Sequence, residues 1–163
     1  MARIELPTRE QAPAEAHEIL DAMQQRWGFL SNGLRLLSLS PSALQAYVDL
    51  QTTMSHVLDA KTREAVALAV SMTNGCNYCV ANHCFITHAN SETAPDEITL
   101  NLEGKSSDPK GAAAATFAKR IIDTHGKVSD ADLAAVRAAG YSDGQIVELH
   151  HIGDPVHPDR LFE

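Results

Sequence analysis

The sequence has few aromatic residues, no long apolar run and no excess of positive charge. Aromatic side chains make up 5% of the 163 residues, and period-two alternation is scarce, so a β-sheet protein is not expected. No apolar run approaches the ~18 residues of a membrane span. Lys and Arg number 13 against 21 Asp and Glu, a net charge of −8, which argues against nucleic acid or an anionic membrane as a partner. The first residues also lack the apolar core of a signal peptide, so we expect a cytoplasmic protein.

Signals for the start and end of helices are frequent along the chain. Asp59 is a candidate N-cap for a helix over residues 60–73. Asn74 and Gly75 follow it, and both tolerate the left-handed conformation in which many helices end. A new helix is expected from Cys76 to about residue 88. Further N-terminal signals occur at Ser40-Pro41, Ser129…Asp132 and Ser142…Gln145.

These signals predict an all-α fold of the bundle type. We expect one domain over residues 1–149, followed by an irregular tail over residues 150–163. The tail is polar and contains two prolines, and its apolar residues have no helical spacing. Near the N-terminus, Gly28 and Asn32-Gly33 are expected to interrupt the helical pattern.

The cysteines form one tight cluster. There are three, Cys76, Cys79 and Cys84, and such an odd, clustered set indicates redox or metal chemistry rather than a structural disulfide framework. Cys76 and Cys79 lie three residues apart, so on a helix they share a face and their sulfurs could form a disulfide. Cys84 is about 140° further round the helix than Cys79, so we expect it to face the core.

His83 and Glu64 complete a candidate catalytic set. The helix N-terminus favours a thiolate at Cys76, whereas His83, one turn beyond Cys79, favours a thiolate at Cys79. We give the histidine more weight, because a nucleophile must transfer its proton to an acceptor. Cys79 is therefore predicted to be the attacking thiolate, and Cys76 the resolving thiol that forms a disulfide with it. The break before Cys76 lets the preceding helix fold back, which would bring Glu64 close to His83 to orient it.

A second function class uses the same residues. Cys76, Cys79, His83 and His88 could bind zinc in principle, and Cys84 adds another thiol. They lie on one short helix with no break, however, whereas Cys₂His₂ sites draw their ligands from two elements. Redox catalysis is therefore favoured, and the alternative is a metal-binding or redox-sensing helical module that uses Cys76, Cys79 and His83 without turnover.

The spacing of the four residues resembles a known family. Glu64, Cys76, Cys79 and His83 form the pattern Glu-x11-Cys-x2-Cys-x3-His, which is similar to the core motif of the AhpD-like alkylhydroperoxidases in the carboxymuconolactone decarboxylase superfamily. The surrounding sequence Asn-Gly-Cys-Asn-Tyr-Cys-Val-Ala-Asn-His resembles the branch described as peroxidase-related. The resemblance extends over residues 31–149.

The resemblance implies an all-α fold and a thiol peroxidase that reduces organic hydroperoxides through a CxxC pair with a Glu/His proton relay. It implies no metal or flavin cofactor, a dithiol reductant such as a lipoyl-bearing protein, and a homo-oligomer, either a trimer or a hexamer. The chain departs from the family pattern at two places. Tyr78 stands where some members have a second histidine, and residues 150–163 lack the family's apolar final helix.

Overall fold

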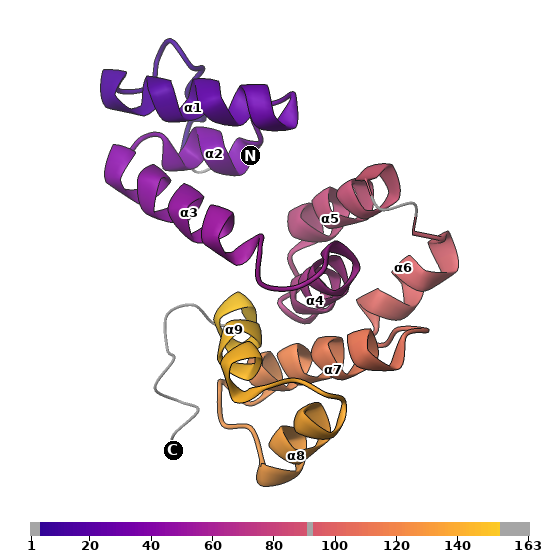
Figure 1. Ribbon diagram of the computed structural model, residues 1–163. Coiled ribbons are helices and arrows are strands. Elements are labelled where there is room, and N and C mark those ends of the chain that lie inside the picture. Colours follow the sequence, from indigo (N-terminus) through magenta and orange to yellow (C-terminus); the bar gives the residue numbers. More distant parts are fainter. Residues whose placement is uncertain (1–3, 91–92, 154–163) are drawn as a thin grey trace. The chain divides into compact units, whose positions relative to one another are not determined.

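The computed structural model describes residues 4–90 and 93–153. Contacts within the chain divide it into two compact units, Met1–Thr53 and Met54–Glu163, and each is described by itself. In the described ranges all the regular secondary structure is α-helical (Figure 1). The predicted all-α fold is therefore confirmed.

The first unit is built from short helices around a small apolar core. The helices are α1 (Ala14–Trp27), α2 (Asn32–Leu37) and α3 (Pro41–Met54). Their buried side chains are Ala16, Leu20, Met23, Leu34, Leu44 and Val48, joined by Ala12. Each helix contributes one apolar stripe, so the core follows from helical spacing.

Helix α2 was not expected, because Asn32-Gly33 was interpreted as a break. The Ser31 side chain accepts a hydrogen bond from the Leu34 N–H at 3.3 Å, so Ser31 is the N-cap of this helix. Leu34 is 1% exposed. The cap and the burial of Leu34 together outweigh the poor helix propensity of Gly33.

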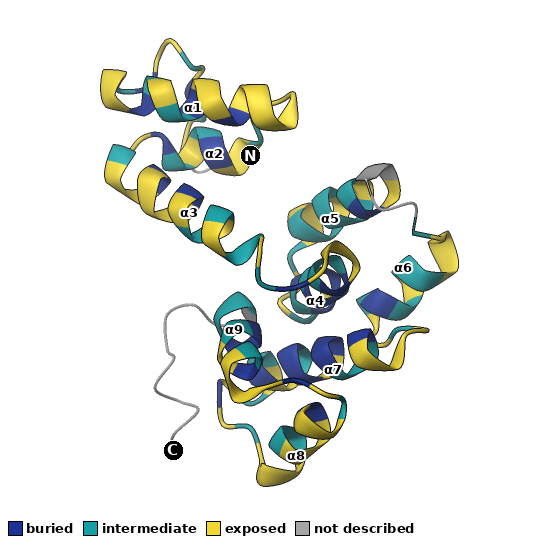
Figure 2. Ribbon diagram, in the orientation of Figure 1, coloured by how far each residue is buried: buried dark blue, intermediate teal, exposed yellow. Residues whose placement is uncertain are grey.

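The second unit surrounds helix α4. Its helices are α4 (Ala60–Thr73), α5 (Asn77–Asn90), α6 (Pro95–Leu102), α7 (Pro109–Asp123), α8 (Asp130–Ala138) and α9 (Asp143–Gly153). Helix α4 packs against α5, α6, α7 and α9, and α7 also packs against α8 and α9. Figure 2 shows buried positions concentrated along α4 and α7, whereas α5 is mostly intermediate or exposed. The largest cluster includes Val66, Phe117, Ile121, Val136 and Leu149.

The predicted caps are present in this unit. The Asp59 carboxylate accepts hydrogen bonds from the Thr62 N–H at 3.0 Å and from its hydroxyl at 2.6 Å. Burial works against the charged carboxylate, yet these hydrogen bonds prevail and hold the pKa of Asp59 below its usual value. Reciprocal hydrogen bonds join Ser129 with Asp132 and Ser142 with Gln145.

Helix α9 extends beyond the end expected for it. It reaches Gly153, so its last turn includes His150, where an irregular tail was predicted to begin. His150 is 0% exposed, and burying this last turn against the core favours helix over loop. The rest of the predicted tail lies outside the described residues. The division into a domain over 1–149 and a tail over 150–163 stays a prediction.

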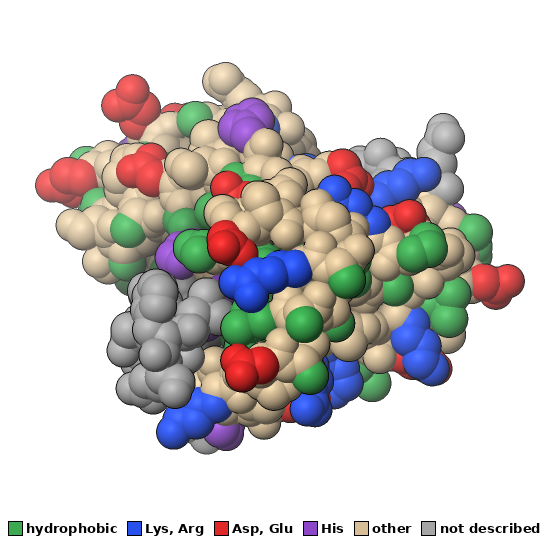
Figure 3. Space-filling model, turned by 60° about the horizontal axis from the view of Figure 1, so that its bottom comes forward, with side chains coloured by type: hydrophobic (Ala, Val, Ile, Leu, Met, Phe, Trp, Pro, Cys, Tyr) green, Lys and Arg blue, Asp and Glu red, His purple; other side chains and the backbone are tan. Residues whose placement is uncertain are grey.

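The surface has charges of both signs. On the face drawn in Figure 3, the described Lys and Arg side chains are scattered among Asp and Glu side chains and form no continuous basic patch. Within residues 4–90 and 93–153, no helix combines the length and the apolar character that crossing a bilayer requires.

Replacing the N-cap of α4 tests how this helix is held. Asp59→Ala should lower the free energy of unfolding by about 1 kcal/mol at pH 7, because the Thr62 N–H loses its acceptor. The pKa of Asp59 is lowered in the folded state, so its contribution is present above the unfolded pKa and is lost as pH falls through the folded value. Urea unfolding at pH 7 and near pH 3 should show the difference from wild type shrinking in acid. Asp123→Ala, which removes only a surface ion pair with Lys119, is the control and should cost under about 0.5 kcal/mol.

Candidate redox site

A tight turn between α4 and α5 places the cysteines. The Gly75 N–H donates to the Met72 carbonyl at 3.0 Å, and the Cys76 N–H donates to the Ser71 carbonyl at 3.1 Å. Gly75 has a φ of 65°, in the left-handed region that favours glycine. This pair of hydrogen bonds is a Schellman motif, which ends α4 and reverses the chain. The stop signal at Asn74-Gly75 is confirmed.

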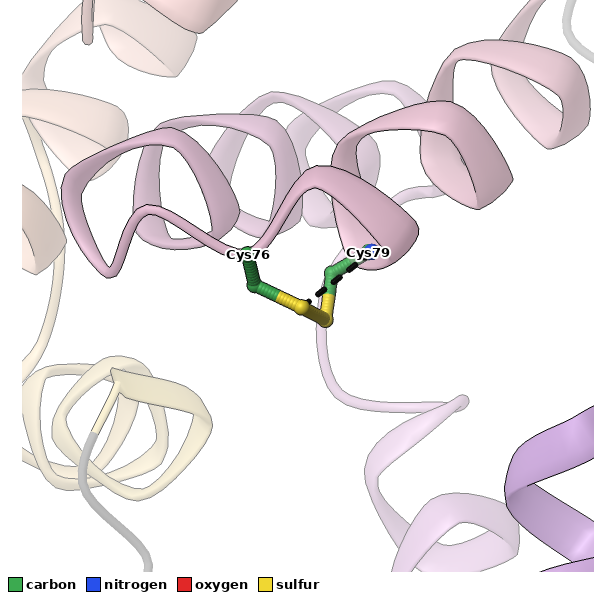
Figure 4. The surroundings of a disulfide bond; sticks show 2 residues. All are labelled: Cys76 and Cys79. Carbon is green, nitrogen blue, oxygen red and sulfur yellow. Dashed lines mark hydrogen bonds between the residues drawn. A yellow bond between two sulfur atoms is a disulfide. The ribbon is translucent and has the colours of Figure 1, made fainter. Parts of the chain in front are cut away.

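Cys76 is also the N-cap of α5. Its carbonyl accepts the first hydrogen bond of the helix, from the Val80 N–H at 2.9 Å. Its Sγ accepts from the Cys79 N–H at 3.2 Å, drawn as a dashed line in Figure 4. The sulfur thus takes the place that a serine or aspartate oxygen has in an ordinary N-cap. The helix begins at Asn77, one residue later than expected, and this capping role was not foreseen.

The two cysteines are joined by a disulfide. Cys76 and Cys79 are bonded through their sulfurs, with 5.3 Å between their Cα atoms, a separation usual for disulfides. Both residues are partly exposed. The expectation that these sulfurs could form a bond is confirmed. Cys84 is a free thiol of intermediate exposure, so it is less buried than expected.

Glu64 and His83 meet across the two helices. His83 Nδ1 lies 3.0 Å from Glu64 Oε2, with side-chain exposures of 29% and 19%. An ionised carboxylate only accepts hydrogen bonds, so this contact places the proton of a neutral imidazole on Nδ1 and leaves the lone pair on Nε2. The sequence suggested that the two residues could lie near each other, and the structure shows them in contact.

A further residue reaches the same carboxylate. The Thr87 hydroxyl donates to Glu64 Oε2 at 3.3 Å, and Thr87 is 1% exposed. The sequence interpretation missed it. The signal was its position four residues after His83, which places both on one face of α5.

The site therefore has two parts on one helix. The disulfide occupies the first turn of α5, and His83 follows Cys79 by four residues, a rise of about 6 Å along the axis. In the described chain no hydrogen bond links His83 to either sulfur. A disulfide sulfur carries no proton to donate, so such a bond belongs to the reduced form.

The side chains proposed as zinc ligands do not converge. Within the described residues, no group of three or more His, Cys, Asp or Glu side chains is arranged to hold a metal ion. Cys76 and Cys79 are bonded to each other, and His83 contacts Glu64. The arrangement is a disulfide in the first turn of α5, followed on the same helix by a histidine in contact with a carboxylate.

A polar cavity lies elsewhere in this unit. It has a volume of about 510 Å³ and is lined by residues of α4, α6 and the start of α7, among them Asp59, Glu97, Asn101 and Asp108. Its carboxylates are already engaged as helix caps and turn acceptors. None of the cysteines lines this cavity, so the cavity is separate from the disulfide.

Comparison with known proteins identifies the family. The model of the carboxymuconolactone decarboxylase family matches residues 41–124. The chain belongs to this family. The matched range contains Glu64, Cys76, Cys79 and His83, so the whole candidate site lies inside the family region.

Solved structures share the fold of this family member at low sequence identity. An uncharacterized peroxidase-related protein from Silicibacter sp. TM1040 has a TM-score of 0.79 and 19% identity, over 96% of this chain and 85% of that one. An AhpD-core, peroxidase-related protein from Ralstonia eutropha JMP134 has a TM-score of 0.78 and 22% identity, over 93% and 84%. A cysteine-to-alanine variant of the debrominase Bmp8, solved with 2,3,4-tribromopyrrole, has a TM-score of 0.76 and 18% identity, over 98% and 88%. The fold is therefore AhpD-like.

A relative of higher identity matches over a shorter stretch. An uncharacterized protein of Haemophilus influenzae is 49% identical over 45 residues, which cover 26% of this chain. The aligned stretch spans 40% of that protein's length.

Substitution of Gly75 tests the turn that positions Cys76. A Cβ at Gly75 would meet nothing within 4 Å, so Gly75→Ala should cost only the strain of a left-handed alanine, about 1 kcal/mol in urea unfolding. Gly75→Asn should cost less, because asparagine tolerates this conformation. Gly144→Ala is the control, since Gly144 is helical and a Cβ there meets only the Ser142 hydroxyl at 3.8 Å; it should be neutral or stabilising. Equal losses at both glycines would contradict the role of the turn.

Proposed function

We propose that this protein is a thiol peroxidase that reduces organic hydroperoxides without a metal or flavin. The observation that supports it is the Cys76–Cys79 disulfide at the N-terminus of α5, followed on that helix by a histidine whose Nδ1 lies 3.0 Å from a carboxylate. Helix N-terminal donors stabilise a thiolate, and an imidazole oriented by a carboxylate accepts a proton. Family membership agrees with this chemistry.

The proposed cycle uses both sulfurs. The Cys79 thiol transfers its proton to His83 Nε2, and its thiolate attacks one peroxide oxygen, breaking the O–O bond. Cys79 becomes a sulfenic acid, and the alkoxide takes the proton held by His83 and leaves as an alcohol. The Cys76 thiol then gives up its proton and its sulfur attacks the Cys79 sulfur. The disulfide forms, and the displaced hydroxide takes that proton and leaves as water. An external dithiol reduces the disulfide and is itself oxidised.

The capping contact supports the division of roles between the cysteines. Cys76 Sγ faces the Cys79 N–H, so a thiolate there gains from the helix terminus. That makes Cys76 a good leaving group when a reductant attacks Cys79, and a ready nucleophile when Cys79 is a sulfenic acid. Cys79, closer to His83, is the peroxide-attacking thiol.

The partners are proposed from the same chemistry. The reductant is a dithiol such as a lipoyl-bearing protein, since a cyclic disulfide product favours complete transfer. For a homo-oligomer, a trimer or a hexamer, the candidate interface residues are exposed apolar side chains of α4 and α5. Met72, Tyr78 and Phe85 are 55%, 51% and 64% exposed, and apolar side chains that gather in one exposed patch mark an interaction site.

Intact mass of the reduced protein, before and after one equivalent of cumene hydroperoxide, tests the cycle directly. The wild type should lose about 2 Da, mapped to Cys76–Cys79, because a disulfide replaces two thiols. Cys76→Ser should instead gain about 16 Da on Cys79, and Cys79→Ser should consume no peroxide. Cys84→Ser is the matched control and should behave as wild type.

Other results of this experiment would overturn the proposal. Oxygen on Cys84 alone would place the nucleophile elsewhere. Unchanged thiols, together with bound zinc in the purified protein, would favour the metal-binding module. A disulfide that forms once but is not turned over by any dithiol would favour a redox sensor.

The role of His83 is testable on a single thiol. In a Cys76→Ser/Cys84→Ser background, His83→Ala should lower the alkylation rate of Cys79 at pH 7 by about tenfold, because one unit of thiol pKa is a factor of ten in thiolate. The rate should be measured with iodoacetamide from pH 5 to 10. His88→Ala removes an exposed histidine from the same helix and is the control. An unchanged profile in His83→Ala would remove His83 from the relay.

A further inference from the structure

One oxygen of Glu64 accepts two hydrogen bonds from α5. His83 Nδ1 lies 3.0 Å from Glu64 Oε2, and the Thr87 hydroxyl lies 3.3 Å from the same oxygen. The two donors are four residues apart and so stand one above the other on the helix. The carboxylate comes from α4, the neighbouring helix. The contact is thus a three-residue bridge between two helices.

The carboxylate needs a second donor to stay in place. A glutamate has three rotatable side-chain bonds, and the Glu64 side chain is 19% exposed, so water can compete for its oxygens. Thr87 is 1% exposed, so its hydroxyl, which donates to Glu64 Oε2 at 3.3 Å, is shielded from solvent. Among the described residues no ion pair joins the neighbouring Arg63 to Glu64, and the Arg63 guanidinium donates to the Leu58 carbonyl.

The position of this oxygen decides which histidine nitrogen carries the proton. With Oε2 in front of Nδ1, the neutral ring is protonated at Nδ1 and Nε2 is free to accept. If the carboxylate swings away, the ring reverts to the Nε2–H tautomer that free histidine prefers. His83 then has no lone pair on Nε2 to offer to Cys79.

We propose that Thr87 is a positioning residue: its hydroxyl holds the Glu64 carboxylate against His83 Nδ1 and so selects the tautomer in which Nε2 can act as the base. The link to catalysis rests on the proposed peroxidase function. The tautomer of His83 does not depend on that function, so the positioning role and the peroxidase function can be tested separately.

The test compares substitutions at Thr87 that remove or keep the hydroxyl with one at a second buried threonine, Thr62, which does not contact Glu64 Oε2. Thr87→Val removes the hydroxyl and keeps the branched shape, whereas Thr87→Ser keeps the hydroxyl. Thr87→Ala serves as a second hydroxyl-free variant if Thr87→Val fails to fold. Thr62→Val is the matched control, because Thr62 is also buried and also donates its hydroxyl to a carboxylate, that of Asp59 at 2.6 Å.

Two readouts are measured on the reduced protein. Nitrogen-15 NMR of the imidazole rings reports the tautomer of His83, assigned among the 8 histidines by its loss in His83→Gln. Stopped-flow kinetics with cumene hydroperoxide report the rate of Cys79 oxidation. Wild type, Thr87→Ser and Thr62→Val should show the Nδ1–H tautomer and rates within about twofold of one another. Thr87→Val should shift the ring toward Nε2–H and slow oxidation by about 3- to 10-fold, as expected for the loss of one ordinary hydrogen bond.

Each outcome decides a separate point. A wild-type tautomer in Thr87→Val and Thr87→Ala would overturn the positioning role. A tautomer change that Thr87→Ser does not rescue, or that Thr62→Val reproduces, would also overturn it, since the cause would be a general loss of packing. A third outcome is that Thr87→Val changes the tautomer and Thr87→Ser restores it, while the thiols of the protein do not react with peroxide. This outcome would support the positioning role and reject the peroxidase function.

Discussion

The reversal of the chain at Gly75 is the constraint on which the site depends. The Schellman hydrogen bonds end α4 at a fixed residue, and Cys76, which follows Gly75, is the N-cap of α5. This reversal brings α5 back against α4, so that Glu64 on one helix meets His83 on the other, 19 residues later in the sequence. Without the left-handed residue the two helices would not turn at this point, and the cysteine would not be at a helix N-terminus.

The N-cap of α5 connects the chemistry to the fold. In most helices the first N–H groups are satisfied by an oxygen of serine, threonine, asparagine or aspartate. Here a disulfide sulfur, that of Cys76, accepts the hydrogen bond from the Cys79 N–H. The same terminal N–H groups that need an acceptor stabilise a thiolate when the disulfide is reduced. One local structure therefore serves both the end of the helix and the reactivity of the sulfur.

The fold by itself does not specify the reaction. Helical bundles of this type serve as frameworks, and the chemistry is decided by the few side chains placed on them. In this chain those side chains lie on two helices that pack face to face, α4 and α5. Glu64 is central because its carboxylate joins them, accepting from His83 and from Thr87. The framework behind it is the apolar core around Val66 and Ile121.

The sequence by itself determined the helical class, the caps at Asp59 and Ser129, the stop at Gly75, and the pattern of Glu64, Cys76, Cys79 and His83. These follow from local rules of spacing and backbone conformation, which act over a few residues. The break predicted from the sequence at Asn32-Gly33 was wrong. Burial of Leu34 supports a helix there, and burial depends on residues far along the chain.

Only the tertiary structure decided which atoms meet. Glu64 on α4 proved to contact His83 on α5, and Thr87 proved to share that carboxylate. Spacing places residues on a face of a helix, but it does not say which face of a neighbouring helix lies opposite. That pairing is set by the packing of the whole unit, and with it the partners of every side chain in the site.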